Sequence, residues 1–387
     1  MSEMKYAISS YQASLFSVTC FPYILARSEF EKAKNKTILL DKIEKQFNSF
    51  LLRIGRSVLN KKLIGPELFD AIELHLTDPR MFYNSLEWKI NEKMIDLVRG
   101  PISSFHAHME IDPLLRKYAF NPSDNSLKTR KAIRSQLETA YKIMHAHPNM
   151  IVTENPVFVF HGGVARSDDD REMALGRTRK SIDEIVTMNN QLWIEYGRDR
   201  KLIPTIENSA SDKLFLCQTI DEWKQAIQGF EEEIKLTLDY GHIQTMGDEK
   251  DKLFKELREG TIGQHIVNLH LHYSPKVSHE TLHAHAALSM IPEDKVEEFQ
   301  NDIKEIISLT AIREQGYITL EVPSKDPFDY MPTLGHIIKR FSPIDKIIKA
   351  TGIFDWSPYR GTIEDQLASL EIAKGIMGDM FSSPQTE

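Results

Sequence analysis

Short apolar runs alternate with longer amphipathic segments along most of this chain. Eight runs have the length and the flanking turn residues of buried parallel strands, at residues 6–10, 69–76, 104–111, 156–161, 202–207, 235–239, 266–272 and 317–322. The intervening segments carry helical periodicity. Ile182, Ile185 and Leu192 recur on one helix face before the fifth run, and Trp223 and Ile227 do so before the sixth.

Strands that alternate with helices predict βαβ units and a parallel sheet. Eight such units predict an α/β fold, the (β/α)8 TIM barrel, as a single domain over residues 1–387. Two regions exceed a minimal barrel. Residues 12–68 predict a helical insertion between the first two strands, and residues 324–387 predict a C-terminal helical extension. The insertion leaves the C-terminal end of the first strand, so part of it is expected beside the barrel mouth.

Composition narrows the class of protein. Of 387 residues, 41% are hydrophobic and 27% charged, which is ordinary for a globular protein. Two cysteines are too few for a disulfide framework, and no stretch resembles a secretory signal or a membrane span, so we expect a cytoplasmic protein with no membrane partner. The formal net charge of −8 argues weakly against a nucleic-acid partner, although bound metal ions supply local positive charge.

Histidines and carboxylates recur at the ends of the predicted strands. In a parallel barrel the C-terminal ends of all the strands open onto one mouth. Polar groups gathered there are costly to bury without a partner, and divalent metal ions are the natural partner for imidazole and carboxylate ligands. The predicted metal ligands are His106, His161, Glu207, Asp239, His242, His270, His283, His285 and Glu321.

The sequence spacing of some of these residues allows their side chains to point in the same direction. The pattern Asp239-Tyr-Gly-His242 lets a carboxylate and an imidazole turn toward one centre. His270 and His272 alternate along a strand, so regular geometry places both imidazoles on one face, whereas a twist at the strand end would separate them. His75, on the second strand, fits a core or rim histidine equally well.

Six short motifs, in order, resemble the endonuclease IV branch of the xylose isomerase-like barrels. Four of the motifs lie at the ends of strands five to eight. They are Glu-Asn-Ser-Ala from Glu207, Leu-Asp-Tyr-Gly-His ending at His242, His270-Leu271, and Leu-Glu-Val-Pro around Glu321. The other two are the histidine of strand three and Phe-His-Gly-Gly on strand four. The resemblance covers about residues 100 to 323. UV-damage endonucleases and multinuclear iron oxidases share much of this ligand set.

The resemblance implies up to three metal ions, with zinc expected and manganese or iron as alternatives. His106 and His161 would hold the first ion, and Glu207 would bridge it to the second. Asp239, His270 and Glu321 would complete the second site. The third site would consist of His242, His283 and His285. The implied reaction is metal-assisted hydrolysis of a phosphodiester in damaged DNA, with Glu207, Glu321 and His242 as the catalytic residues.

The chain departs from the family pattern at three places. Where the family has Asp-Arg-His after strand seven, this chain has His283-Ala284-His285, which removes a negative charge from the third site. Where the family has an apolar pair that wedges into the DNA duplex, this chain has Met109-Glu110. The strand-four motif becomes His161-Gly162-Gly163-Val164. The ligands therefore match the family better than the DNA-binding surface does.

Two other functions remain open. A sugar isomerase or epimerase would use one divalent metal held by Glu207, Asp239, His270 and Glu321 and would act on a small sugar or sugar phosphate. In it, Glu207 and Glu321 would exchange a proton at carbon. A multinuclear iron oxidase would instead modify a peptide. A DNA-binding function would need a basic groove, for which the candidates are Arg166, Arg171, Arg177 and Lys180. The sequence does not indicate an oligomeric state.

Overall fold

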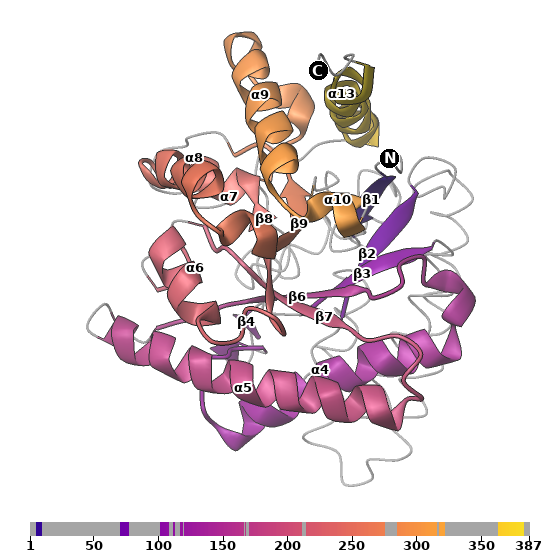
Figure 1. Ribbon diagram of the computed structural model, residues 1–387, viewed down its shortest axis with the longest axis vertical. Helices are drawn as coiled ribbons and strands as arrows, with labels where there is room; N and C mark the ends of the chain where they lie inside the picture. Colours follow the sequence, from indigo (N-terminus) through magenta and orange to yellow (C-terminus); the bar gives the residue numbers. More distant parts are fainter. Residues whose placement is uncertain are drawn as a thin grey trace, which may run out of the picture.

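Eight parallel strands form a closed barrel, as the alternating pattern predicts (Figure 1). The computed structural model of the chain describes residues 5–9, 70–76, 101–107, 111–112, 117–118, 120–165, 167, 170–210, 214–274, 285–315, 317–321 and 363–382. The barrel strands are β1 (Lys5–Ser9), β2 (Ala71–His75), β3 (Ile102–His106), β6 (Val157–His161), β7 (Ile203–Glu207), β8 (Lys235–Asp239), β9 (Ile266–Leu271) and β10 (Tyr317–Leu320). Their order around the barrel is β1-β10-β9-β8-β7-β6-β3-β2.

The two faces of the strands differ in polarity. On β7 and β8 one set of alternate residues is polar, and the hydroxyls of Thr205 and Thr237 lie 2.7 Å apart inside the barrel. The other set, such as Ile206 and Leu236, packs into the apolar core between the barrel and its helices. Since side chains alternate with a period of two, this register carries the polar set to the mouth, where β7 ends in Glu207 and β8 in Asp239.

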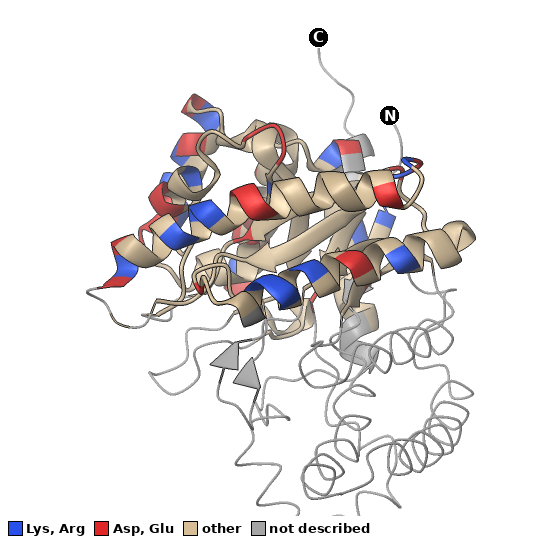
Figure 2. Ribbon diagram, turned by 90° about the horizontal axis from the view of Figure 1, so that it is seen from below, with Lys and Arg blue, Asp and Glu red and all other residues tan. Residues whose placement is uncertain are grey.

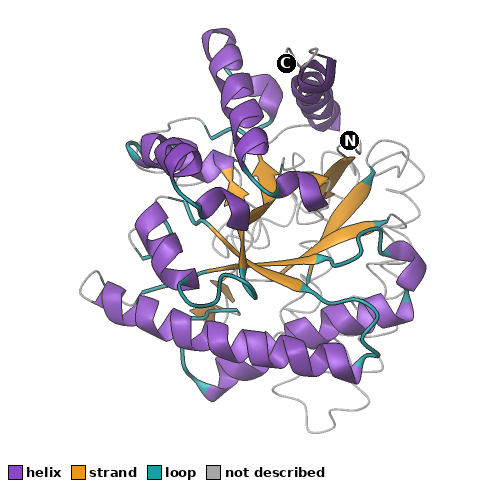
Figure 3. Ribbon diagram, in the orientation of Figure 1, coloured by secondary structure: helices purple, strands orange, loops and turns teal. Residues whose placement is uncertain are grey.

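Helices surround the barrel on the outside (Figure 3). They are α4 (Leu127–Ala146), α5 (Arg171–Glu195), α6 (Ile220–Ile227), α7 (Tyr240–Gln244), α8 (Glu249–Glu259), α9 (Glu293–Leu309), α10 (Ile312–Gln315) and α13 (Ile363–Ser382), with short 3-10 turns η2 (Pro148–Met150), η4 (Ile262–His265) and η5 (Leu288–Met290). The predicted apolar stripe of α5 is buried at Ile182, Ile185 and Leu192. The hydrophobic effect thus holds α5 against the strands.

Helix α13, from the predicted C-terminal extension, packs against the barrel. The hydroxyl of Tyr6 on β1 donates to the carbonyl of Ala373 at 3.1 Å, and the amide of Leu288 donates to Ser369 Oγ at 2.9 Å. Leu370 and Ile376 are buried in the same core as the strands. Residues 324–362 of the extension and the predicted insertion at residues 12–68 lie outside the described residues.

The prediction for the third strand was wrong in its bounds. Strand β3 begins at Ile102 and ends at His106, and the predicted run to residue 111 does not continue it. Residues Ile111–Asp112 (β4) instead pair with Lys117–Tyr118 (β5) in a separate antiparallel ribbon. The alternating pattern continues past His106, the last residue of β3 that pairs with β2 and β6. In the part of the chain that the structure describes, every helix is too short or too polar to span a lipid bilayer.

Candidate metal centre

The predicted ligands come together at the C-terminal ends of the barrel strands. His106 ends β3, His161 ends β6, Glu207 ends β7 and Asp239 ends β8. His270 lies one residue before the end of β9, and Glu321 directly follows β10. His242 lies on α7, and His285 follows the connection after β9. His283 lies outside the described residues, so its predicted role stays untested.

Glu207 occupies the centre of this constellation and is 1% exposed. Its Oε2 lies 3.0 Å from Nε2 of His106 and 3.3 Å from Nε2 of His161. Its Oε1 lies 3.3 Å from Nδ1 of His270 and 3.8 Å from Nδ1 of His242. The two oxygens of one carboxylate therefore face different imidazoles, which is the arrangement of a carboxylate that bridges two cations.

The donor atoms fit metal binding. Four ligands at about 2.1 Å from an ion stand about 3.4 Å apart, at the edges of a tetrahedron. Glu321 Oε1 lies 3.5 Å from His270 Nδ1, and Glu321 Oε2 lies 3.4 Å from His285 Nδ1, close to that separation and longer than ordinary hydrogen bonds. Among the described residues, His270 Nδ1 and His285 Nδ1 are buried and have no hydrogen-bond partner. Such groups are rare unless a further species binds them.

The charges of the site shift its pKa values strongly. Burial opposes ionisation of Glu207, but His161, His270 and His106 outweigh it and hold the carboxyl pKa well below its usual range. Burial also opposes protonation of His270, yet the surrounding carboxylates, Glu73 first, raise its pKa well above the ordinary value. Burial lowers the pKa of His161 to about 4. The same site therefore shifts the pKa values of His161 and His270 in opposite directions.

Local structure explains the Asp239-x-x-His242 spacing. Asp239 is the N-cap of α7, and its Oδ1 accepts the backbone amide of His242 at 2.9 Å. The side chain of Asn208 bonds both backbone groups of Asp239, at 2.7 and 2.9 Å. The carbonyl of Asn208 lies 2.8 Å from Nδ1 of His242, which makes Nδ1 the protonated nitrogen and Nε2 the lone-pair nitrogen.

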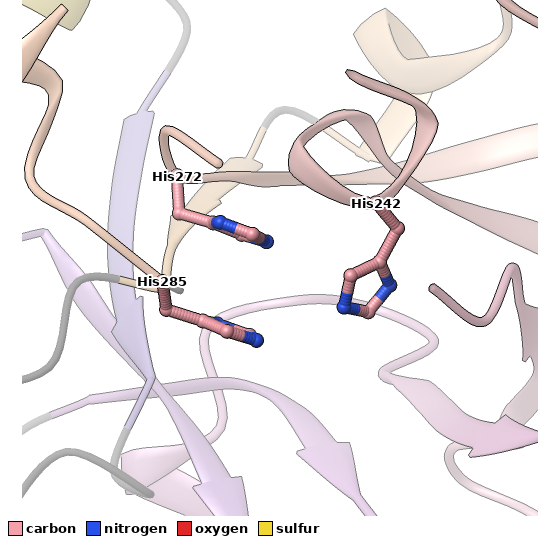
Figure 4. A group of neighbouring side chains, drawn as sticks. All are labelled: His242, His272 and His285. Atoms are coloured by element: carbon pink, nitrogen blue, oxygen red, sulfur yellow. The ribbon is translucent and has the colours of Figure 1, made fainter. Parts of the chain in front are cut away.

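A third group consists of His242, His272 and His285 (Figure 4). The rings of His272 and His285 are stacked, with centroids 3.9 Å apart and planes 8° from parallel. Because imidazole lone pairs lie in the ring plane, two stacked rings do not direct lone pairs at one point. His272 Nε2 lies 2.9 Å from Asp239 Oδ1, so His272 orients that carboxylate, and the ring of His285 is the one that faces the mouth with an unpartnered nitrogen.

Comparison with known proteins identifies the family. The model of one family, described as the xylose isomerase-like TIM barrel, matches residues 65–353. The chain belongs to the xylose isomerase-like TIM-barrel family. No curated protein matches it in sequence.

Several solved structures match the chain. A protein from Anabaena variabilis designated a sugar phosphate isomerase/epimerase has a TM-score of 0.51 and 10% identity, covering 98% of this chain and 100% of that one. D-allulose 3-epimerase from Methylomonas sp. has a TM-score of 0.47 and 15% identity, with 80% and 87% covered. Endonuclease IV from Thermus thermophilus has a TM-score of 0.42 and 16% identity, with 75% and 94% covered. At such identities the likeness concerns the fold.

This xylose isomerase-like barrel also contains residues at its mouth that are not among the predicted ligands. They are Glu73 and His75 on β2, and His272 after β9. The alternation of His270 with His272 was a visible signal for a shared face. Glu73 and His75 also alternate, but a carboxylate inside an apolar run is equally typical of a structural ion pair, and the position of His75 fits a core or rim histidine equally well.

Ion pairs reduce the positive charge that the predicted basic groove could offer to phosphates. Arg171 pairs with both carboxylate oxygens of Glu222, and Arg177 pairs with Asp170 at 2.6 Å. Figure 2 shows basic and acidic positions interspersed along the outer helices. Arg166 lies outside the described residues. Arginines held by carboxylates are poorly available to phosphates, so Arg171 and Arg177 are weak candidates for a phosphate-binding groove.

Proposed function

We propose that the protein is a multinuclear, divalent-metal-dependent phosphodiester hydrolase, with damaged DNA as its substrate class. The observation that carries this proposal is the position of Glu207. Its two oxygens face separate sets of imidazoles, which suits two neighbouring cations better than one. His242 and His285 add donors for a third, and phosphoryl transfer benefits from cations that act on the attacking and leaving oxygens together.

The residues divide into three groups of ligands. His106, His161 and Glu207 form the first, and Glu207, Asp239, His270 and Glu321 form the second. His242 and His285 begin the third, for which His283 remains a further candidate. Mixed nitrogen and oxygen donors suit zinc first, and also manganese or iron. When bound, such ions would supply Lewis acidity that polarises a phosphoryl oxygen.

The chain's own side chains prepare that chemistry. The imidazoles hold the carboxyl pKa values of Glu207 and Asp239 below their usual range against the effect of burial, which favours the anionic form of both. Asn208 holds Asp239 and His242 in one relative position. This rigidity matters because a small misplacement of reacting groups lowers a rate strongly.

Cleavage of a DNA duplex that contains one abasic site tests the proposal. Protein loaded with zinc or manganese should cut the damaged strand, and Glu207→Gln should reduce the rate at least about a hundredfold. Glu195→Gln, an exposed change at the end of α5, serves as the matched control and should cut normally. Full metal occupancy with no cleavage of abasic or other damaged duplexes would overturn the proposal.

A sugar isomerase or epimerase is the second candidate. It is favoured by the group Glu207, Asp239, His270 and Glu321, which brings four buried donors together around a single position. Two carboxylates in that group could exchange a proton at a sugar carbon while the metal polarises the neighbouring oxygens. The paired arginines described above also count less against a small substrate than against DNA. Exchange of solvent deuterium into ketohexoses and sugar phosphates, without DNA cleavage, would favour this candidate.

A further inference from the structure

Strand β2 brings two side chains into the mouth that belong to none of the three ligand groups proposed above. Glu73 is 0% exposed. Its Oε2 lies 3.0 Å from the hydroxyl of Ser104 and 3.1 Å from Nε2 of His270. Its Oε1 has no hydrogen-bond partner among the described residues. A buried carboxylate oxygen without a partner is costly, so this atom points to a missing ligand.

The groups around Glu73 Oε1 have the spacing of metal donors. His75 Nε2 lies 3.5 Å from Glu73 Oε1 and 3.8 Å from Glu321 Oε1. Both separations exceed an ordinary hydrogen bond and approach the edge of about 3.4 Å expected for ligands around a small divalent ion. Two of the three donors lie on β2, and the third, Glu321 Oε1, is the carboxylate oxygen that does not face His285.

Stacking separates this set from the neighbouring one. The rings of His75 and His106 are 4.1 Å apart and 5° from parallel. Their lone pairs therefore lie in two separate planes, and an ion in the plane of one ring stands well above the plane of the other. Since Nε2 of His106 faces Glu207, an ion held by His75 is distinct from the one held by His106.

We propose that Glu73 Oε1, His75 Nε2 and Glu321 Oε1 form a further divalent-cation site beside the Glu207 centre. Two carboxylates and one imidazole suit zinc or manganese, with water completing the coordination. Glu73 then has two tasks, because its other oxygen orients the ring of His270 so that Nδ1 points toward Glu207. The inference concerns ion binding alone and does not depend on which reaction the protein catalyses.

Ion counting on the purified protein tests the proposal. Wild type and His75→Ala are loaded separately with zinc and with manganese, desalted, and analysed by native mass spectrometry and elemental analysis. We expect His75→Ala to hold one ion fewer per chain than wild type, with the remaining ions bound at unchanged affinity. The exposed His145→Ala on α4 is the control and should keep the wild-type count. A wild-type count in His75→Ala would overturn the proposal.

Two further variants keep the test decisive. His75→Gln preserves a polar side chain should the alanine variant fail to fold, and it should lose the same ion. Glu73→Gln should lose that ion and also weaken binding at His270 by about 10- to 100-fold, because the ring loses the negative charge of its acceptor. If Glu73→Gln weakens metal binding at His270 but retains the extra ion, the result would contradict the site at Glu73, His75 and Glu321. Absence of DNA cleavage would overturn the proposed function without altering any of these counts.

Discussion

Oε1 of Glu207 lies 3.3 Å from Nδ1 of His270, longer than a normal N–H···O hydrogen bond and close to the separation of two ligands on one metal ion. That nitrogen has no hydrogen-bond partner among the described residues. The other oxygen of Glu207 faces His106 and His161. One buried carboxylate thus joins two sets of donors.

Glu207→Gln removes the charge shared by both sets of donors while preserving the size of the side chain. We expect metal affinity to fall at least about a hundredfold, since removing a ligand should cost no less than removing the partner of a ligand. Isothermal titration of metal-free protein with zinc measures the change. Retention of wild-type affinity would show that Glu207 is a structural residue. Glu195→Gln, at the far end of α5, should titrate like wild type.

The variant His285→Ala tests whether the metal centre holds a third ion. Nδ1 of His285 faces Glu321 and has no hydrogen-bond partner in the described part of the chain, so its removal should release the ion held with His242 and leave those at Glu207 in place. Activity should then fall sharply. Elemental analysis together with turnover measures both effects, and full turnover in this variant would exclude a role for a third ion.

The strand ends were predictable from the sequence because their signals are local. Alternation and burial mark β7 and β8, and a titratable residue at each end follows directly from the register of a parallel barrel. The partners of these residues were harder to predict. Whether His272 or His283 approaches His242 depends on the course of a connection, and Glu73 meets His270 only because residues 197 positions apart lie on strands of one barrel.

Metal binding should release protons. Burial disfavours the charged imidazolium of His270, but the carboxylates around it, led by Glu73, raise its pKa well above the usual value. A raised pKa in the folded state stabilises metal-free protein fully below the unfolded pKa of about 6.5, and this contribution is lost as the pH rises through the folded pKa. A metal ion must displace the proton, so affinity should rise with pH.

Calorimetry in buffers of different ionisation enthalpy checks this coupling. At pH 7 the apparent binding enthalpy should depend on the buffer with a slope of at least about one proton released per chain. The dependence should persist in His145→Ala, which alters an exposed histidine. A binding enthalpy that is the same in every buffer would mean that His270 carries no proton in the metal-free protein.

Gly241→Ala tests the role of His272. A Cβ at this position would overlap the His272 ring, which holds Asp239, so the ring must move. We expect a loss of about 1–3 kcal/mol in the free energy of unfolding, together with weaker metal binding. Denaturant titration and calorimetry measure the two effects. Gly176→Ala on α5, where an added Cβ meets nothing, is the control and should be neutral or stabilising. Equal behaviour of the two variants would contradict a supporting role for His272.

The number of ions per chain tests most directly whether Glu207 bridges two metal ions. Native mass spectrometry of protein purified without added metal or a metal-binding tag should show more than one divalent ion per chain, with zinc the expected element. The count should fall in Glu207→Gln and remain unchanged in Glu195→Gln. A single ion per chain, unaffected by further loading, would contradict a centre bridged by Glu207 and would favour the isomerase chemistry instead.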